Sequence, residues 1–412
     1  MTAWTRRLIA LFAAAVPAIA CAWAPRLSSA QAMDRNWINV RSFEDRVVDL
    51  GTETEDWQPA FMEAARVAKE SGRPVYVPAG VFKIRSAIDV PYVEDPQETP
   101  VGHGYPLRII GGGQWRSMIQ QMDDSANILN WSGPTYEKSL ARGSIKDICL
   151  VGGATALNIK WHNNFTMDTC YIHGAHEYGV YAEGWSSQFL NTTIRWCFNV
   201  GLYGGAHFNN ITIRDGYYSR CGVGIYLNGG YGVRVDGVGM EVCANSAIVA
   251  RMMKKLAITG CYFEGNGAAV PEYIERGPTY PGQIYLGYAN RSVTISDCIL
   301  RVNVSETGGL IAITHCTDGR ISDNLLQIRG QEVGVLLRSH AQIGAEIPNH
   351  VVRLVVEDNH YVFEADQAEE PLKVWYGEES PGLLEKALER GCEFEEHEAN
   401  TREGIVTNAP DP

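Results

Sequence analysis

The sequence lacks the motifs that mark common metal, redox and nucleotide sites. Its ten cysteines form no CxxC pair and its ten histidines show no HxH or HxxxH spacing, which excludes the usual zinc and dithiol motifs. Gly111–Gly113 does not extend to GxGxxG, and no P-loop occurs, so the dinucleotide and phosphate signatures are absent. We therefore predict no cofactor and no metal, with a calcium requirement left open.

Positive charge is also scarce. Lys and Arg total 35 against 48 Asp and Glu, which gives a net charge of −13. A nucleic-acid-binding protein needs a basic footprint, so nucleic acid is not predicted as the partner.

Long apolar runs are rare, and the clearest one stands near the start of the chain. Leu8–Trp23 follows Arg6 and Arg7, and Ala30–Ala32 offers small residues for a signal peptidase. The run is too short to span a membrane comfortably. It predicts an export signal over residues 1–32, and hence a periplasmic or secreted bacterial protein without a membrane span.

Two details of this signal leave the route and the anchoring open. Thr5–Ile9 partly matches a twin-arginine signal, which would export an already folded protein. Cys21 follows a weak lipobox and offers a lipid anchor as the less favoured alternative. Removing residues 1–32 takes away three arginines and no acidic residue, so the mature charge would be −13 − 3 = −16.

What the sequence does contain is a repeat. Gly179, Gly201 and Gly224 begin similar segments that stand 22 and 23 residues apart, and each segment alternates apolar and polar residues as a half-buried strand does. The segments are Gly179–Glu183, Gly201–Gly205, Gly224–Asn228, Ala247–Arg251, Gln283–Gly287 and Gly334–Arg338.

A second strand lies between consecutive segments of this repeat. Examples are Ile145–Cys149, Ile211–Ile213, Val233–Val235, Val293–Ile295 and Arg320–Ser322. One such unit cannot bury its own apolar face, whereas stacked units can. The sequence thus predicts an all-β fold, a single-stranded right-handed parallel β-helix, over residues 33–363.

Both ends of this solenoid are predicted to be capped, since open ends invite edge pairing. Asp56–Ser71 has helical spacing and stops at Gly72, and Ser380–Arg390 has the start signals of a short helix. Residues 364–412 form an acidic cap or tail, with 13 acidic against 4 basic residues between 364 and 403.

Cysteines recur through the repeat at Cys149, Cys170, Cys197, Cys221, Cys243, Cys261 and Cys298. Export would favour disulfides. The repeat instead favours small residues stacked inside the coils, so we predict free, buried thiols.

Several stretches resemble the pectate lyase superfamily. They are "INVRSFEDR", "FMEAARVAKESGRPVYVPAGVFKI", "LRIIGGG", "ITGCYFEGNG" and "VTISDCIL", within residues 37–363. The resemblance implies a parallel β-helix with an N-terminal cap and a polysaccharide or oligosaccharide ligand. The family includes lyases, hydrolases, uronan epimerases and phage tailspikes, so it does not select a reaction.

The chain departs from the motifs of the enzyme subfamilies that it resembles. Polygalacturonase-like motifs are missing, since Asn191–Thr193 is the nearest fragment and lacks the acid. Asp95–Glu98 is similar to the epimerase motif DPHE in letters only and lies too early. No catalytic residue is carried over from the family.

The repeat itself predicts an outward ladder of aromatic residues. If Val180, Leu202, Ile225, Ile248 and Ile284 point inward, the next residue on each strand points outward. That outward ladder is Tyr181, Tyr203, Tyr226, Val249 and Tyr285. Tyrosine can pack on a sugar ring and hydrogen-bond it, so a sugar platform of Tyr181, Tyr203 and Tyr285 is predicted, while a purely stabilising ladder is the alternative.

A polar ladder runs two residues further on, and aromatic and histidine residues occupy the flanking turns. It contains Lys160, Glu183, Gly205, Asn228 and Arg251. A Lys160–Glu183 ion pair is the simplest interpretation of its first two members. Glu183, His176 and Trp185 are predicted to bind substrate.

Two catalytic arrangements are compatible with these residues. For β-elimination on a uronan, Tyr226 or His207 would be the base, while Arg251 and Asn228 would neutralise the substrate carboxylate. For hydrolysis, Glu241 and Glu264 could form the required carboxyl pair. A polysaccharide lyase is the first hypothesis, a glycoside hydrolase the second, and a non-catalytic carbohydrate-binding protein the third.

Overall fold

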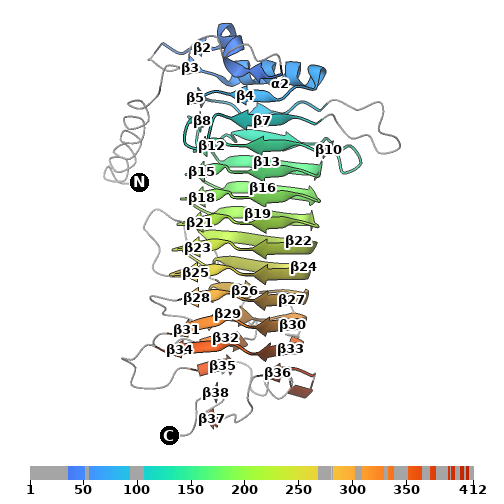
Figure 1. Ribbon diagram of the computed structural model, residues 1–412, viewed down its shortest axis with the longest axis vertical. Helices are drawn as coiled ribbons and strands as arrows, with labels where there is room; N and C mark the ends of the chain where they lie inside the picture. The colour runs from blue at the N-terminus through green and yellow to red at the C-terminus, as the bar shows by residue number, and fades with distance from the viewer. Residues whose placement is uncertain are drawn as a thin grey trace.

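The computed structural model describes residues 36–51, 55–92, 106–267, 280, 282–301, 309–328, 333–337 and 351–363, followed by the short pieces 372–376, 388–389, 391–394, 400–402 and 405–407. The predicted export signal and most of the predicted acidic tail lie outside these residues. The described chain is a tall column of stacked coils with a helix across one end (Figure 1).

Each central coil contains three strands, one more than the sequence predicted. One coil, for example, consists of β19 (Val200–Asn209), β20 (Thr212–Arg214) and β21 (Tyr217–Ser219). Strands of successive coils pair in parallel. The column therefore has three faces, called here the first, second and third face in the order in which the chain visits them.

The first face carries the predicted repeat segments. Its strands are β6 (Ile88–Asp89), β9 (Leu129–Ser132), β10 (Leu140–Ala141), β13 (Thr155–Asn163), β16 (Tyr178–Trp185), β19, β26 (Ile284–Leu286), β29 (Gly309–Ile313), β32 (Val333–Leu337) and β35 (Leu372–Tyr376). β22 (Val223–Asp236) and β24 (Ile248–Thr259) bend and continue onto the second face, so both faces belong to one 25-stranded sheet.

The second face carries the other predicted strand of each repeat. Its strands are β1 (Ile38–Asn39), β4 (Val75–Val77), β7 (Arg108–Gly111), β11 (Ser144–Lys146), β14 (Thr166–Asp168), β17 (Gln188–Leu190), β20, β27 (Asn290–Ser296), β30 (Cys316–Ser322), β33 (Val351–Glu357) and β36 (Glu393–Phe394).

The third face is a separate 11-stranded sheet of short strands. These are β5 (Gly80–Ile84), β8 (Ser117–Gln121), β12 (Cys149–Val151), β15 (Tyr171–His173), β18 (Thr193–Arg195), β21, β23 (Gly239–Glu241), β25 (Tyr262–Glu264), β28 (Ile299–Arg301), β31 (Leu325–Ile328) and β34 (His360–Phe363).

The turn between the second and third faces uses one left-handed residue in each coil. Asn191 and Asp215 have φ of 49° and 53° there, and Gly237 has 61° in the next coil. Asn, Asp and Gly are the residues that adopt this conformation most readily. The segment predicted as one strand, Ile145–Cys149, crosses this turn at Asp147, whose φ is 54°.

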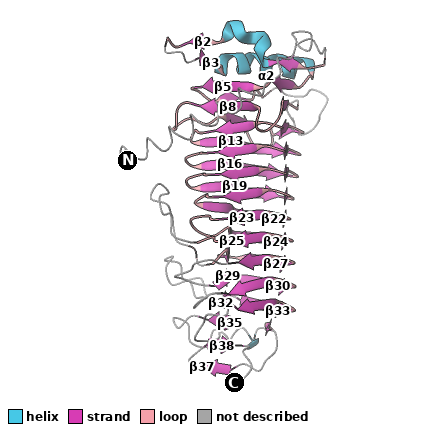
Figure 2. Ribbon diagram, turned by 60° about the vertical axis from the view of Figure 1, so that its left-hand side comes forward, coloured by secondary structure: helices cyan, strands magenta, loops and turns pink. Residues whose placement is uncertain are grey.

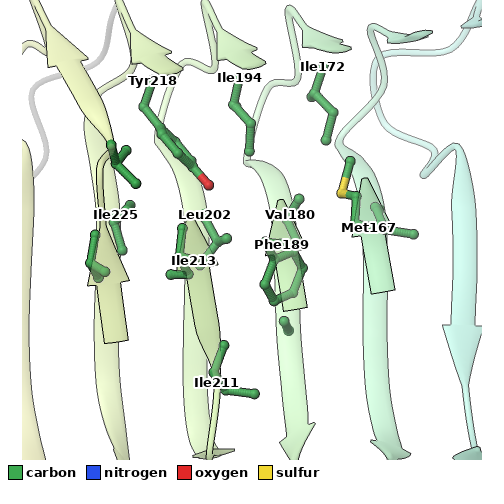
Figure 3. Close-up of a cluster of buried hydrophobic side chains, with 14 of the residues drawn as sticks. Met167, Ile172, Val180, Phe189, Ile194, Leu202, Ile211, Ile213, Tyr218 and Ile225 are labelled. Carbon is green, nitrogen blue, oxygen red and sulfur yellow. The ribbon is translucent and has the colours of Figure 1, made fainter. Parts of the chain in front are cut away.

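The interior is filled by the residues predicted to point inward. Val180, Leu202 and Ile225 are fully buried and lie in register on adjacent coils. Figure 3 shows them in one stack with inward residues of the other faces, among them Phe189, Ile194 and Tyr218. The register of the first face predicted from the sequence is confirmed.

The N-terminal cap also follows the prediction. After the 3₁₀ helix η2 (Val40–Arg46) and the hairpin of β2 (Val48–Asp49) and β3 (Glu55–Asp56), α2 (Gln58–Ser71) ends at Gly72, which is left-handed with φ 67°. Figure 2 shows these helices across one end of the column. Their buried side chains, such as Phe61, close the interior of the first coil.

At the other end, an antiparallel pair is described. β37 (Asn400–Arg402) pairs with β38 (Ile405–Thr407), and β38 pairs with β35. The predicted helix Ser380–Arg390 lies outside the described residues except for Leu388 and Glu389, which are helical.

The cysteines are the buried free thiols that the repeat predicted. Nine are free and buried, from Cys149 to Cys392. Burial raises the pKa of the Cys149 thiol to about 12, so this thiol carries no charge at neutral pH.

Candidate functional site

The outward ladder of the first face has the predicted register. Tyr181 pairs with Tyr203 and Tyr203 pairs with Tyr226 on successive coils, β16, β19 and β22. We call these three residues the tyrosine ladder. Asn158 precedes it by one coil and Val249 follows it by one coil.

The three rings stack on one another. Ring centres of Tyr181 and Tyr203 are 5.1 Å apart with the planes 12° from parallel, and those of Tyr203 and Tyr226 are 5.3 Å apart at 16°. Both faces of the Tyr203 ring are therefore turned towards other tyrosines, as in a stabilising ladder of like residues. The prediction that a sugar packs on this ring face is corrected: the ladder offers ring edges and hydroxyl groups.

Each hydroxyl group of the tyrosine ladder is hydrogen-bonded to a side chain of the polar ladder, which stands two residues further along each strand. The Tyr181 hydroxyl donates to Glu183 Oε1 at 2.5 Å. Asn228 Nδ2 donates to the Tyr203 oxygen at 2.9 Å, and Arg251 Nη1 donates to the Tyr226 oxygen at 3.2 Å.

These contacts place the ladder in an ordered polar strip. Its ends differ in character, because a carboxylate accepts from Tyr181 at one end while a guanidinium donates to Tyr226 at the other. Asn228 and Arg251 are themselves paired on adjacent coils. The predicted association of Tyr226, Asn228 and Arg251 is therefore present in the structure.

Lys160 and Glu183 adopt an arrangement other than the predicted ion pair. Lys160 Nζ lies 4.8 Å from the centre of the Tyr181 ring, as a cation–π contact. The Glu183 side chain crosses Gly205, where a Cβ atom would collide with its Cγ and Oε1 atoms. Gly205 thus leaves the space that lets Glu183 reach Tyr181.

The electrostatic environment of the strip differs along its length. Burial and the hydrogen bond to the Glu183 carboxylate raise the pKa of Tyr181, which keeps this hydroxyl protonated. Burial acts to lower the pKa of Arg251, but the hydrogen bond to Tyr226 and the charge interactions with Tyr226, Tyr280 and Tyr285 together raise it. A fixed positive charge therefore stands beside the Tyr226 oxygen.

The lower end of the predicted platform is buried. Tyr285 pairs with Val249 as expected, but it is only 3% exposed and Val249 is 0% exposed. Tyr280 packs on them from outside, with its ring centre 5.3 Å from that of Tyr285. The prediction of Tyr285 as an accessible sugar contact is corrected, because Tyr280 and its neighbours make a small apolar cluster over this part of the face.

Tyr280 and Tyr178 are members of the site that the sequence did not reveal. The Tyr280 hydroxyl donates to the Tyr226 oxygen at 3.4 Å. Tyr178 lies against Tyr181 and Tyr203, with ring centres 5.4 and 5.2 Å away. Tyr178 stands one residue before the repeat segment, and Tyr280 three residues before its own, so a pattern built on the segments omitted both.

His207 and Trp185 belong to a different cluster. The His207 ring lies 5.7 Å from Tyr136 and 5.4 Å from Trp161, and Tyr136 lies 5.0 Å from Trp185. These four rings gather where β13, β16 and β19 reach the bend of the coil. The predicted grouping of His207, as the alternative base, with Arg251 and Asn228 is corrected: its ring contacts are with this cluster.

His176 also lies apart from the ladder. Its Nε2 atom is 3.4 Å from Asp124 Oδ1, and its ring packs edge-on against Phe198 at 4.6 Å. It stands in the turn before β16. These contacts account for His176 as a residue that packs within the fold, and they require no substrate.

Glu241 and Glu264 are neighbours, as predicted, but on the third face. They are paired on adjacent strands, β23 and β25, which places them about 4.8 Å apart along the column. Glu241 accepts from the Tyr217 hydroxyl at 2.7 Å and Glu264 from the Tyr262 hydroxyl at 2.5 Å. The predicted carboxyl pair thus lies on a different face of the column from the tyrosine ladder.

Within the described residues, no group of three or more His, Cys, Asp or Glu side chains is placed to hold a metal ion. Over the same residues, no helix has the length and apolar character needed to cross a membrane.

Comparison with known proteins identifies the fold. The family model described as "Right handed beta helix region" matches residues 155–326. The chain is a right-handed parallel β-helix protein. Its fold is the one that the resemblance to the pectate lyase superfamily implied. No curated protein sequence matches this β-helix protein.

Solved structures share the β-helix at low sequence identity. The Azotobacter vinelandii mannuronan C-5 epimerase AlgE4 A-module has a TM-score of 0.51 at 12% identity, over 83% of this chain and 100% of that one. The catalytic domain of a GH87 alpha-1,3-glucanase variant in complex with tetrasaccharides also has a TM-score of 0.51 at 12% identity, over 87% and 70% of the two chains. At this identity the likeness establishes the fold alone.

Proposed function

We propose that this protein is an exported polysaccharide lyase that cleaves a uronic-acid-containing polysaccharide by β-elimination. The observation that carries the proposal is the Arg251–Tyr226 contact at 3.2 Å on the outward surface of the first face. It joins a fixed cation to a hydroxyl group that can exchange a proton, which are the two parts that such a reaction needs.

The substrate carboxylate would bind at Arg251 and Asn228. Guanidinium carries five N–H donors, so Arg251 can hold Tyr226 and a carboxylate together. Asn228 stands one coil away in direct register. Neutralising the carboxylate makes the proton on the adjacent C5 carbon easier to remove.

Tyr226 would act as the base in this scheme. Two donors, Arg251 Nη1 and the Tyr280 hydroxyl, hold its oxygen in place. The Tyr226 oxygen takes the C5 proton, the C5–H electrons form the C4–C5 double bond, and the C4–O bond breaks. The leaving oxygen then takes a proton from Tyr226 or water. The products are an unsaturated uronate and a new chain end. Tyr181 does not fit this role, since its pKa is raised.

Structures with the same fold include proteins that act on polysaccharides. One is named a mannuronan C-5 epimerase and others are alpha-1,3-glucanases. They support a carbohydrate as ligand for this fold, while the choice of β-elimination rests on the residues of the first face.

The test is ultraviolet absorbance of the unsaturated product on a panel of uronans. Wild type is expected to raise the absorbance on one of them, and Arg251→Ala to lose at least about a hundredfold in rate, as for removal of an oxyanion-type donor. Arg291→Ala is a matched control, because Arg291 is exposed on β27. Unchanged cleavage by Arg251→Ala would contradict the assignment.

A hydrolase remains the second candidate because of one observation. Glu241 and Glu264 are paired on adjacent strands of the third face, and adjacent strands lie about 4.8 Å apart. Retaining glycosidases hold their two carboxyl groups about 5–5.5 Å apart. New reducing ends without unsaturated product, lost in both Glu241→Gln and Glu264→Gln, would favour it. Binding without either product would leave the third hypothesis, a carbohydrate-binding protein.

A further inference from the structure

Four aromatic rings form an exposed cluster at the bend between the first and second faces. Tyr136, in the loop between β9 and β10, contacts each of the others: Trp161 at 5.9 Å, Trp185 at 5.0 Å and His207 at 5.7 Å. We call these four residues the aromatic corner. They come from the ends of three consecutive strands and one loop.

The aromatic corner exposes aromatic ring surface, which is covered in the tyrosine ladder. Tyr136 is 49% exposed and His207 is also exposed, while Trp161 and Trp185 are half-buried. In the ladder, by contrast, ring faces are turned towards one another. Clustered exposed aromatic side chains commonly mark a binding surface on a soluble protein.

The position of the aromatic corner indicates what the ligand is. Each coil that contributes to it also contributes to the polar strip: Lys160 precedes Trp161, and Glu183 stands two residues before Trp185. Two residues of strand span about 6.6 Å, so a saccharide that touches Glu183 can reach Trp185.

We infer that the aromatic corner is a saccharide subsite that packs on a pyranose ring of the polysaccharide lying over the tyrosine ladder. This inference rests on the proposed function for the identity of the polysaccharide. The indole rings take the apolar ring face, while the Tyr136 hydroxyl and the His207 nitrogens can hydrogen-bond sugar hydroxyls. The subsite positions the chain and takes no part in the reaction.

Affinity gel electrophoresis with polygalacturonate or alginate in the gel tests this inference. Tyr136→Ala and Trp185→Ala are expected to be retarded about tenfold less strongly than wild type, as for the loss of an aromatic contact. Trp115→Ala is the matched control, since Trp115 is 55% exposed and packs on Tyr171 of the third face. Trp185→Phe should restore most of the retardation.

The outcomes separate the subsite from the proposed reaction. Equal retardation of Tyr136→Ala, Trp185→Ala and Trp115→Ala would overturn the subsite, and so would a wild type that neither polymer retards. If the aromatic variants lose retardation but wild type releases no unsaturated product, the subsite stands and the lyase proposal fails. Tyr136 lies in a surface loop, so its variant keeps the test valid if Trp185→Ala folds poorly.

Discussion

At the scale of single residues, Gly205 sets the shape of the polar strip. The Glu183 side chain crosses it to reach the Tyr181 hydroxyl at 2.5 Å. Gly205→Ala is expected to push Glu183 aside and break this hydrogen bond. Because a flexible side chain meets the new methyl group, the free energy of unfolding should fall by only about 1 kcal/mol. The pKa of Tyr181, which burial and Glu183 raise, should fall.

Chemical denaturation and an alkaline ultraviolet titration of tyrosine measure the two effects. Gly201→Ala is the control in the same strand, because a Cβ atom there would lie 2.5 Å from the carbonyl oxygen of Gly224. Backbone cannot move aside as a side chain does, so about 2–3 kcal/mol should be lost. Equal losses in the two variants would argue against the described path of Glu183.

His162 gives the fold a dependence on pH. It is buried beside Phe165 and Ser187, and burial lowers its pKa to about 3. An unfolded chain binds this proton below a pH of about 6.5, whereas the folded chain does not until about 3. Stability from this group is therefore full above pH 6.5 and is lost progressively as the pH falls towards 3.

The expected loss at pH 5 is about 2 kcal/mol relative to neutral pH. His173, whose pKa burial also lowers, adds a change in the same direction. Denaturation curves of wild type and His162→Gln at pH 7 and pH 5 isolate the contribution of His162 to this loss of stability. If the two proteins lose equal stability, His162 is accessible to protons in the folded state.

At the scale of elements, the strands of the first face were predictable and those of the third were not. β16 and β19 are long enough for apolar and polar residues to alternate several times. β18 and β21 contain three residues each, so alternation has no length in which to appear. These short strands become evident only from their pairing with strands of the neighbouring coils.

The left-handed residue between the second and third faces permits an element-scale test. Asp297 has a φ of 56°, and Gly260 holds the same position one coil earlier. Asp297→Gly should therefore leave stability nearly unchanged, whereas Asp297→Val should cost about 1–2 kcal/mol. Thermal denaturation of the two variants checks this, and a valine variant as stable as wild type would contradict the turn geometry.

At the scale of the whole molecule, the sequence predicted which residues lie in register on successive coils, but not how their side chains pack. Tyr181, Tyr203 and Tyr226 were placed correctly because register follows from the repeat. The burial of Tyr285 depends on Tyr280, which arrives from outside the repeat. The sequence grouped His207 with Arg251 and Asn228 as a possible base, but the end of β19 brings its ring to Trp161 instead.

The buried thiols report on the integrity of the whole column. Nine free cysteines are spread over the coils from Cys149 to Cys392, and all are buried. Ellman's reagent should therefore react with none of these nine cysteines in the folded protein and with all nine in denaturant. A protein that retains the signal has one further thiol, Cys21, which is not counted among the nine. Their reaction in native conditions must wait for the local opening of a coil.

Coils of a solenoid contact only their neighbours, so opening should begin at an end of the column. Cys392 immediately precedes β36 and accepts a hydrogen bond from Leu354 of β33, near the last described coil. Cys221, by contrast, lies between coils on both sides. Mass spectrometry after brief labelling with an alkylating reagent should find Cys392 modified before Cys221. Labelling of Cys221 first would show that the column opens in its middle, and fewer than nine reactive thiols in denaturant would show that disulfides form among the stacked cysteines.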